Sequence, residues 1–185
     1  MKTKIICITL LILLLGQWLY GQLRFDRFAV NPKIGTYSTF KESGGIVGGM
    51  EINTTYEKWM FSLDYYYLDE FAIVFYDKPL EYYNQIGFMA GSYLGEGFLR
   101  CQFQAGVAPI WGLRRTALIN PSQFLGGDEY DSEKFLTVGV GLKLGLKINP
   151  WENVGFGIDL QTNINSKNTF WMPLLSVEFG KIRTK

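Results

Sequence analysis

Residues 135–148 show the clearest regular pattern in the chain, an alternation of apolar side chains with small or basic ones. Every even-numbered residue from Leu136 to Ile148 is aliphatic, whereas the odd-numbered residues after Phe135 are threonine, glycine or lysine. Side chains alternate across a β-strand with a period of two, so the segment is predicted to be a strand with one apolar and one polar face. A helical period would mix the two kinds of side chain on every face.

Seven further segments fit the same template. They are 30–40, 45–54, 59–67, 82–92, 98–111, 154–163 and 169–180. Short connections are predicted at 55–58, 94–96 and 149–153, and the longest ones at 68–81 and 112–134. No helical pattern appears after residue 22. The pattern predicts an all-β fold, an eight-stranded antiparallel up-and-down barrel.

Three prolines interrupt these predicted strands: Pro32, Pro109 and Pro173. Proline cannot donate a hydrogen bond to a neighbouring strand. All three lie near the ends of their predicted strands, where we expect β-bulges to accommodate them.

The first residues are predicted to be a signal peptide, 1–21, and not part of the barrel. Lys2 and Lys4 precede an apolar run that ends at Leu15, which is shorter than the ~20 residues of a spanning helix. We expect cleavage after Gly21, which leaves a mature chain, 22–185, of one domain. An uncleaved anchor or a buried helix is the alternative.

Alternation alone does not decide which face of the barrel meets solvent. A soluble lipocalin-like barrel turns its apolar face inward around a ligand, whereas a transmembrane β-barrel turns it outward to lipid. The polar face here is rich in glycine and poor in charge, which suits a narrow lumen better than a solvated surface. Aromatic residues also gather near strand ends, as in membrane barrels: Trp59, Tyr65, Tyr67, Trp111, Trp151 and Trp171. We therefore predict a transmembrane barrel and keep a secreted soluble lipocalin-like carrier of an apolar ligand as an alternative.

Composition removes several classes of function. The 18 basic and 17 acidic side chains nearly balance, so the net charge gives no reason to expect that the protein binds nucleic acid. The chain has no histidine, which excludes Ser-His-Asp and Cys-His nucleophiles and metal sites that contain histidine. Its two cysteines, Cys7 and Cys101, are too few for a zinc cluster. We predict no catalytic residue, no cofactor and no metal.

A balanced set of charged residues is predicted to point into the barrel. It comprises Lys33, Glu51, Asp64, Arg100, Lys143, Lys147, Asp159 and Glu178. Charges in a narrow lumen are unfavourable unless they are paired, so we expect a mutual network that fixes the register of the barrel. A polar pore lined by the same residues is the alternative, which would make the protein a narrow passive channel for small solutes. Acid–base chemistry by Asp64, Asp159 and Glu178 is disfavoured, because no nucleophile or cleft accompanies them.

The second candidate site is the predicted loop 112–134. Strand directions follow from the short turns, which are expected in the periplasm, so this loop and 68–81 should emerge outside the cell. Long loops are often functional, and this one combines apolar, basic and acidic residues. Its candidate contacts with a surface protein or with lipopolysaccharide are Arg114, Arg115, Phe124, Asp128, Glu129 and Asp131. A flexible cap without a partner is the alternative, and the acidic cluster lacks the spacing of a calcium-binding EF-hand.

A signal peptide followed by eight alternating strands, with short and long connections in turn, resembles the small OmpA/OmpX-type outer-membrane barrels. The glutamine at the expected mature start, Gln22, and the Gly-Tyr-rich strands are similar to the outer-membrane β-barrel proteins of Bacteroidota. The resemblance covers 22–185 and implies a location in the cell outer membrane, in contact with lipid and lipopolysaccharide. It also implies that the barrel assembly machinery reads a terminal aromatic residue, here Phe179. Barrel enzymes of this architecture that act on lipid A use histidine, so the resemblance implies a non-enzymatic protein with a structural or surface-interaction role.

Overall fold

The computed structural model describes residues 26–40, 44–70, 81–95, 97–120 and 129–182. Within these ranges the chain forms eight strands: β1 (Arg27–Thr39), β2 (Gly44–Tyr56), β3 (Trp59–Glu70), β4 (Tyr82–Leu94), β5 (Leu99–Asn120), β6 (Glu129–Ile148), β7 (Val154–Ile164) and β8 (Phe170–Lys181). None of the described residues belongs to a helix long and apolar enough to cross a membrane. The predicted signal peptide, 1–21, and the predicted contacts Phe124 and Asp128 lie outside the described residues.

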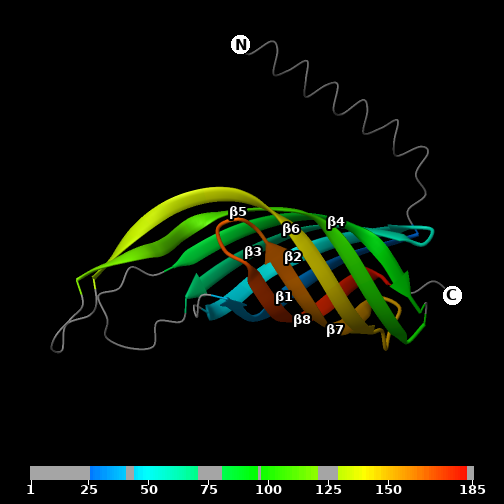
Figure 1. Cartoon of the computed structure of the whole chain (residues 1–185). Helices are drawn as coiled ribbons and strands as arrows, with labels where there is room; N and C mark the ends of the chain where they lie inside the picture. The colour runs from blue at the N-terminus through cyan, green and yellow to red at the C-terminus, as the bar shows by residue number, and fades with distance from the viewer. Residues whose placement is uncertain (1–25, 41–43, 71–80, 96, 121–128, 183–185) are drawn as a thin grey trace, which may run out of the picture.

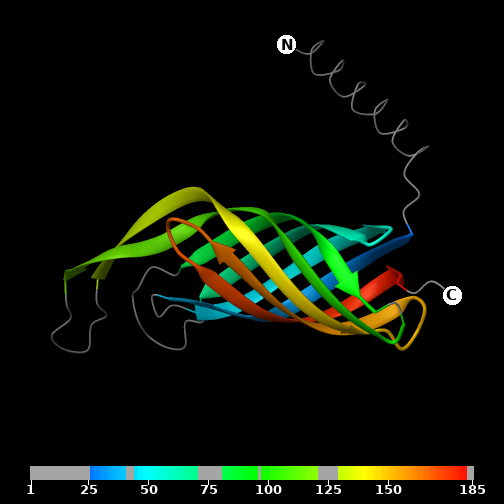
Figure 2. The same ribbon diagram turned by 45° about the vertical axis from the view of Figure 1, so that its right-hand side comes forward.

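The strands form one closed antiparallel sheet (Figures 1 and 2). Each strand pairs with its neighbours in sequence, and β8 pairs with β1. Following the paired residues once around the barrel from Gly145 on β6 leads to Phe135 on the same strand, a stagger of ten residues. A stagger of this kind requires strands that tilt by roughly 35–45° from the barrel axis. The predicted eight-stranded up-and-down barrel is confirmed.

The two ends of the barrel differ. β1, β3, β5 and β7 begin, and β2, β4, β6 and β8 end, at one end of the barrel, which we call the turn end (Figure 1). The turns 57–58 and 149–153 lie there. β1, β3, β5 and β7 end at the opposite end, which we call the loop end. The assignment of short connections to one end agrees with the sequence pattern.

The prediction of a loop over 112–134 is wrong for most of these residues, which belong to strands. β5 continues to Asn120 and β6 begins at Glu129, and the two strands remain paired up to these residues. The alternation is weak here because the charged residues of this segment do not follow a period of two. Backbone pairing nevertheless extends through it, with irregularities between Arg115 and Asn120.

The extended part of β5 and β6 stands out from the barrel as a two-stranded hairpin (Figure 2). The pairing of β4 with β5 ends at Leu113, and the pairing of β7 with β6 ends at Val140. We call the part beyond Leu113 on β5 and before the buried Phe135 on β6, residues 114–120 and 129–134, the projecting hairpin.

The prolines occur within strands and without bulges, contrary to the expectation. Pro32 and Pro109 lie well inside β1 and β5, and no register shift accompanies them. Instead, the backbone pairing is interrupted: the β1–β8 ladder skips Asn31 and Pro32, and it skips again opposite Pro173. The β4–β5 ladder skips the position of Pro109. Proline has no N–H to donate, and each of these prolines stays paired on one side only: Pro32 with Met50, Pro109 with Val138 and Pro173 with Leu160.

The strands turn their polar faces into the barrel. On β6, Lys143 and Lys147 are almost completely buried, whereas Leu142 is 43% exposed and Leu144 is 60% exposed. Large exposed hydrophobic side chains occur on the outer face of each described strand. A lipocalin-like carrier needs the opposite arrangement, so the structure does not support that alternative.

Candidate functional site

The eight charged residues predicted to face the lumen all lie inside the barrel, where none is more than 4% exposed. They come from β1, β2, β3, β5, β6, β7 and β8, and they are Lys33, Glu51, Asp64, Arg100, Lys143, Lys147, Asp159 and Glu178. Inward positions that are widely separated in sequence are thus brought together by the closure of the sheet.

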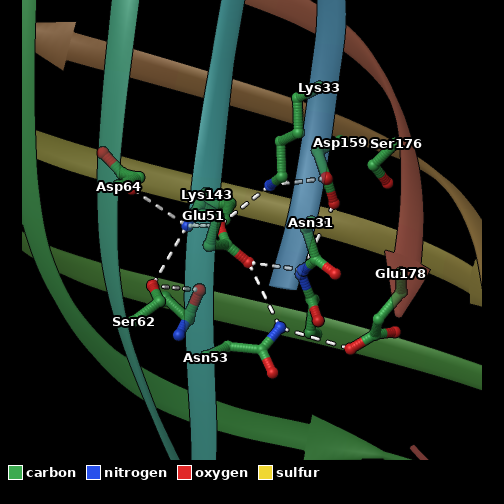
Figure 3. Close-up of polar contacts among 12 residues, drawn as sticks. Asn31, Lys33, Glu51, Asn53, Ser62, Asp64, Lys143, Asp159, Ser176 and Glu178 are labelled. Atoms are coloured by element: carbon green, nitrogen blue, oxygen red, sulfur yellow. Dashed lines mark hydrogen bonds and ion pairs between the residues drawn. The ribbon is translucent and has the colours of Figure 1, made fainter. Parts of the chain in front are cut away.

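Glu51 on β2 occupies the centre of this group (Figure 3). Its Oε2 accepts hydrogen bonds from the Nζ atoms of Lys33, at 2.8 Å, and of Lys143. Its Oε1 accepts hydrogen bonds from the Nδ2 atoms of Asn31, at 3.0 Å, and Asn53, at 3.4 Å. Each carboxylate oxygen of the buried Glu51 therefore accepts two hydrogen bonds.

Two further carboxylates complete the pairing of the lysines. Asp159 on β7 lies 2.7 Å from the Nζ of Lys33 and 2.6 Å from the Nζ of Lys147, measured to its Oδ2. Asp64 on β3 lies 3.2 Å from the Nζ of Lys143, also through its Oδ2. Each buried ammonium group thus faces at least one carboxylate, which offsets the cost of removing it from water.

The remaining two charges form a separate pair that an asparagine connects to the centre. The guanidinium of Arg100 on β5 donates to Oε2 of Glu178 on β8. The Nδ2 of Asn53 lies 3.2 Å from Oε1 of Glu178 and also reaches Glu51. Four positive and four negative side chains therefore form one connected and neutral set, which we call the lumen network.

A layer of aromatic and aliphatic side chains fills the lumen between this network and the loop end. The ring centroid of Tyr83 lies 4.9 Å from that of Phe170, 5.8 Å from that of Phe135 and 6.1 Å from that of Tyr37. The whole layer is buried and comprises Tyr37, Val47, Tyr66, Leu68, Tyr83, Ile110, Phe135, Phe170, Met172 and Leu174. We call it the aromatic layer. The sequence analysis missed it, although the inward positions of Tyr66, Met172 and Leu174 were a signal for it.

The two arginines predicted to contact a partner are paired within the chain at the loop end. Arg114 donates to Oε2 of Glu133 at 2.9 Å, and this hydrogen bond lowers the pKa of the Glu133 carboxyl. The guanidinium of Arg115 pairs with Glu70, and its backbone N–H donates to Oε1 of Glu81 at 2.8 Å. The guanidinium of Arg114 therefore joins β5 to β6, and that of Arg115 reaches past β4 to β3. The charges of both are compensated without an external phosphate.

Two of the acidic residues predicted for the same surface, Glu129 and Asp131, belong to the described ranges. Glu129 is the first residue of β6, and the exposed Asp131 accepts a hydrogen bond from the backbone N–H of Ser132 at 2.8 Å. Within the described ranges, no group of three or more ligand-type side chains is arranged to hold a metal ion.

Two solved structures are similar to this barrel. The N-terminal β-barrel domain of OprF from Pseudomonas aeruginosa matches with a TM-score of 0.59 and 18% identity, over 85% of this chain and 99% of that chain. Neisserial surface protein A matches with a TM-score of 0.61 and 12% identity, over 83% of this chain and 96% of that chain. Similarity at this level of identity shows a shared fold. No family model matches the sequence, and a search of the curated proteins gives no match.

Proposed function

We propose that the chain is an integral protein of the bacterial outer membrane, without enzymatic activity and with a structural or surface-interaction role. The observation that carries this proposal is the distribution of side chains across the barrel wall. The lumen network is buried, whereas large hydrophobic residues are exposed on the outside of every described strand. Such an outer surface is unfavourable in water and favourable in hydrocarbon. A closed sheet also pairs its backbone polar groups internally, as lipid requires.

The exposed aromatic residues support the same environment. Trp59 and Trp151 lie at the turn end, and Tyr67 and Trp171 lie towards the loop end of the outer wall. Indole and phenol rings favour the two interfaces of a bilayer, because one part of each ring is apolar and one part can meet water. The apolar band between these residues is the part that we expect to lie in lipid.

Cell fractionation combined with gel mobility tests this proposal. The protein should remain in the outer-membrane fraction, and its band should shift on boiling, because a closed barrel stays folded in detergent until it is heated. Recovery of the protein in the soluble periplasm would contradict the proposal.

We further propose that the lumen is closed and that the protein is not a passive channel. Every side chain of the aromatic layer is buried, and the lumen network occupies the lumen next to this layer towards the turn end. An eight-stranded barrel encloses about enough room for its own side chains. The charges then serve to fix the register of the strands.

The surface-interaction role is assigned in this proposal to the projecting hairpin. Within the described residues, no strand pairs with β6 on its β7 side before Val140. An exposed strand edge offers backbone groups to an extended segment of a partner protein. The exposed residues Asp131, Glu133 and Lys134 present both signs of charge there, which makes the edge selective and protects it from aggregation.

A photo-crosslinking amino acid at position 132 tests this role in growing cells. We expect a discrete adduct with a surface protein from position 132 and none from position 58, which lies in a turn at the opposite end. Absence of any adduct from position 132 would contradict the assignment to the hairpin and leave the membrane barrel unaffected.

A further inference from the structure

An apolar groove of about 550 Å³ lies on the outer wall across β6, β7, β8 and β1. Its walls are outward aliphatic and aromatic side chains, among them Ile34, Phe156, Ile158 and Leu175. The volume falls within the range of about 300–1,000 Å³ that is typical of small-molecule sites. The groove therefore has the size of a ligand site on a surface that we propose to face lipid.

The groove coincides with an interruption of the β1–β8 ladder. Backbone pairing stops at Val30, opposite Phe179, and resumes at Lys33. The skipped residue Pro32 lines the groove together with Val177 of β8. Because both side chains are short and the ladder is incomplete, the wall is hollowed at this seam.

An indole packs against the turn-end wall of the groove, and a lysine lies four residues beyond the groove residue Val177 on the outward face of β8. Lys181, the last residue of β8, is exposed and pairs with Phe28 on the outer wall. No ion pair joins Lys181 to another of the described residues. Trp151 in the β6–β7 turn packs against Phe156, with ring centroids 6.4 Å apart, and Phe156 lines the groove. An apolar groove with an interfacial indole at its end, and an available ammonium about 13 Å further along the same strand, matches an amphiphile with an anionic head group.

We propose that this groove binds one anionic phospholipid of the periplasmic leaflet. One acyl chain lies in the groove across the β1–β8 seam, and the phosphate contacts the ammonium of Lys181 at the level of Trp151. The proposal rests on the proposed membrane location and orientation. A second groove, over β4 to β7, has no such cation. The lysine that lines it, Lys143, points into the lumen and belongs to the lumen network.

Native mass spectrometry tests the site. The full-length mature chain is folded into vesicles of phosphatidylethanolamine and phosphatidylglycerol and then transferred to detergent. We expect one retained phosphatidylglycerol per wild-type barrel. Lys181→Gln should lower the retained fraction about fivefold, the factor expected for one lysine near an anionic membrane surface. Val177→Trp, which fills the groove, should abolish retention.

The matched controls are Lys58→Gln, another exposed lysine at the turn end, and Ala105→Trp, which fills the second groove. Both should retain lipid as the wild type does. Equal retention by all variants, retention of phosphatidylethanolamine in equal amount, or a wild-type barrel without lipid would overturn the site. The heat-dependent mobility shift is recorded for each sample. A wild type that never folds into the vesicles contradicts the proposed function, whereas a folded barrel without lipid contradicts only the site.

Discussion

Glycine residues provide the space that the lumen network occupies. A Cβ atom on Gly87 would lie 2.1 Å from Oδ1 of Asp64, and one on Gly145 would lie 2.3 Å from Oδ1 of Asp159. Neither separation is possible between non-bonded atoms, so any larger residue at these positions would displace a network carboxylate. The glycine-rich polar face in the sequence is therefore the counterpart of the charges, which need room to reach one another in a narrow barrel.

At the centre of the network, Glu51→Gln should destabilise the barrel. The substitution keeps the shape of the side chain but leaves Lys33 and Lys143 with less compensating charge in a buried site. We expect the free energy of unfolding to fall by about 3–5 kcal/mol, as when one partner of a buried ion pair is removed. Denaturant titration in vesicles measures this change. Glu57→Gln, in the exposed turn 57–58, is the control and should leave the unfolding midpoint in place.

The outward face is tested by placing a charge on it. Leu142→Arg should cost on the order of 2–4 kcal/mol, because the guanidinium would enter hydrocarbon near the middle of the wall. Ser132→Arg, on the same strand in the projecting hairpin, should have little effect. Gly141→Arg should be harmful for another reason, since even a Cβ there lies 3.0 Å from Met89. If Leu142→Arg inserts into vesicles as well as the wild type, the outward assignment is wrong.

At the scale of elements, period-two alternation marks a strand only where its two faces meet different surroundings. In the barrel wall one face lines the lumen and the other lies outside, and the predicted strands agree closely with β3, β7 and β8. In the projecting hairpin the wall is no longer closed, so alternation is not required there. Cross-strand interactions such as Arg114 with Glu133, which lie directly opposite each other, support this pairing instead.

The orientation of the elements is tested by labelling single cysteines in cells. In a Cys101→Ser background, Ser132→Cys should react with a membrane-impermeant maleimide on intact cells, because the projecting hairpin leaves the loop end. Lys58→Cys, at the turn end, should react only after the outer membrane has been opened. The reverse result would place the hairpin in the periplasm and remove the proposed interaction surface.

At the scale of the whole molecule, the lumen is divided into layers. Arg114 and Arg115 form ion pairs at the loop end, the aromatic layer lies below them, and the lumen network follows towards the turn end. The buried Ile182 and Arg27 lie at the turn end itself. An apolar layer next to a neutral ionic layer, both buried, supports the proposal that the lumen is closed to ions.

We therefore expect no stable openings from the purified protein in planar bilayers. The variant Arg100→Ala, which removes the partner of Glu178, should also show no conductance, because the aromatic layer is still present. Single-channel recording across a voltage ramp measures this, and protein-free bilayers are the control. Steady conductance in the wild type that rises in Arg100→Ala would favour the narrow channel instead.

The sequence alone determined the strands of the barrel wall and the division of each strand into an apolar and a polar face, because alternation depends only on neighbours two positions apart. It placed Lys33, Glu51 and Asp159 on inward faces without any knowledge of their partners. Only the tertiary structure decided which inward residues meet, because the stagger of the closed sheet sets their relative heights. Arg100 thus pairs with Glu178, 78 residues away, and Tyr83 packs against Tyr37, Phe135 and Phe170 in edge-to-face or tilted contacts. The projecting hairpin and the groove at the β1–β8 seam depend on pairing between strands, which no local pattern in the sequence encodes.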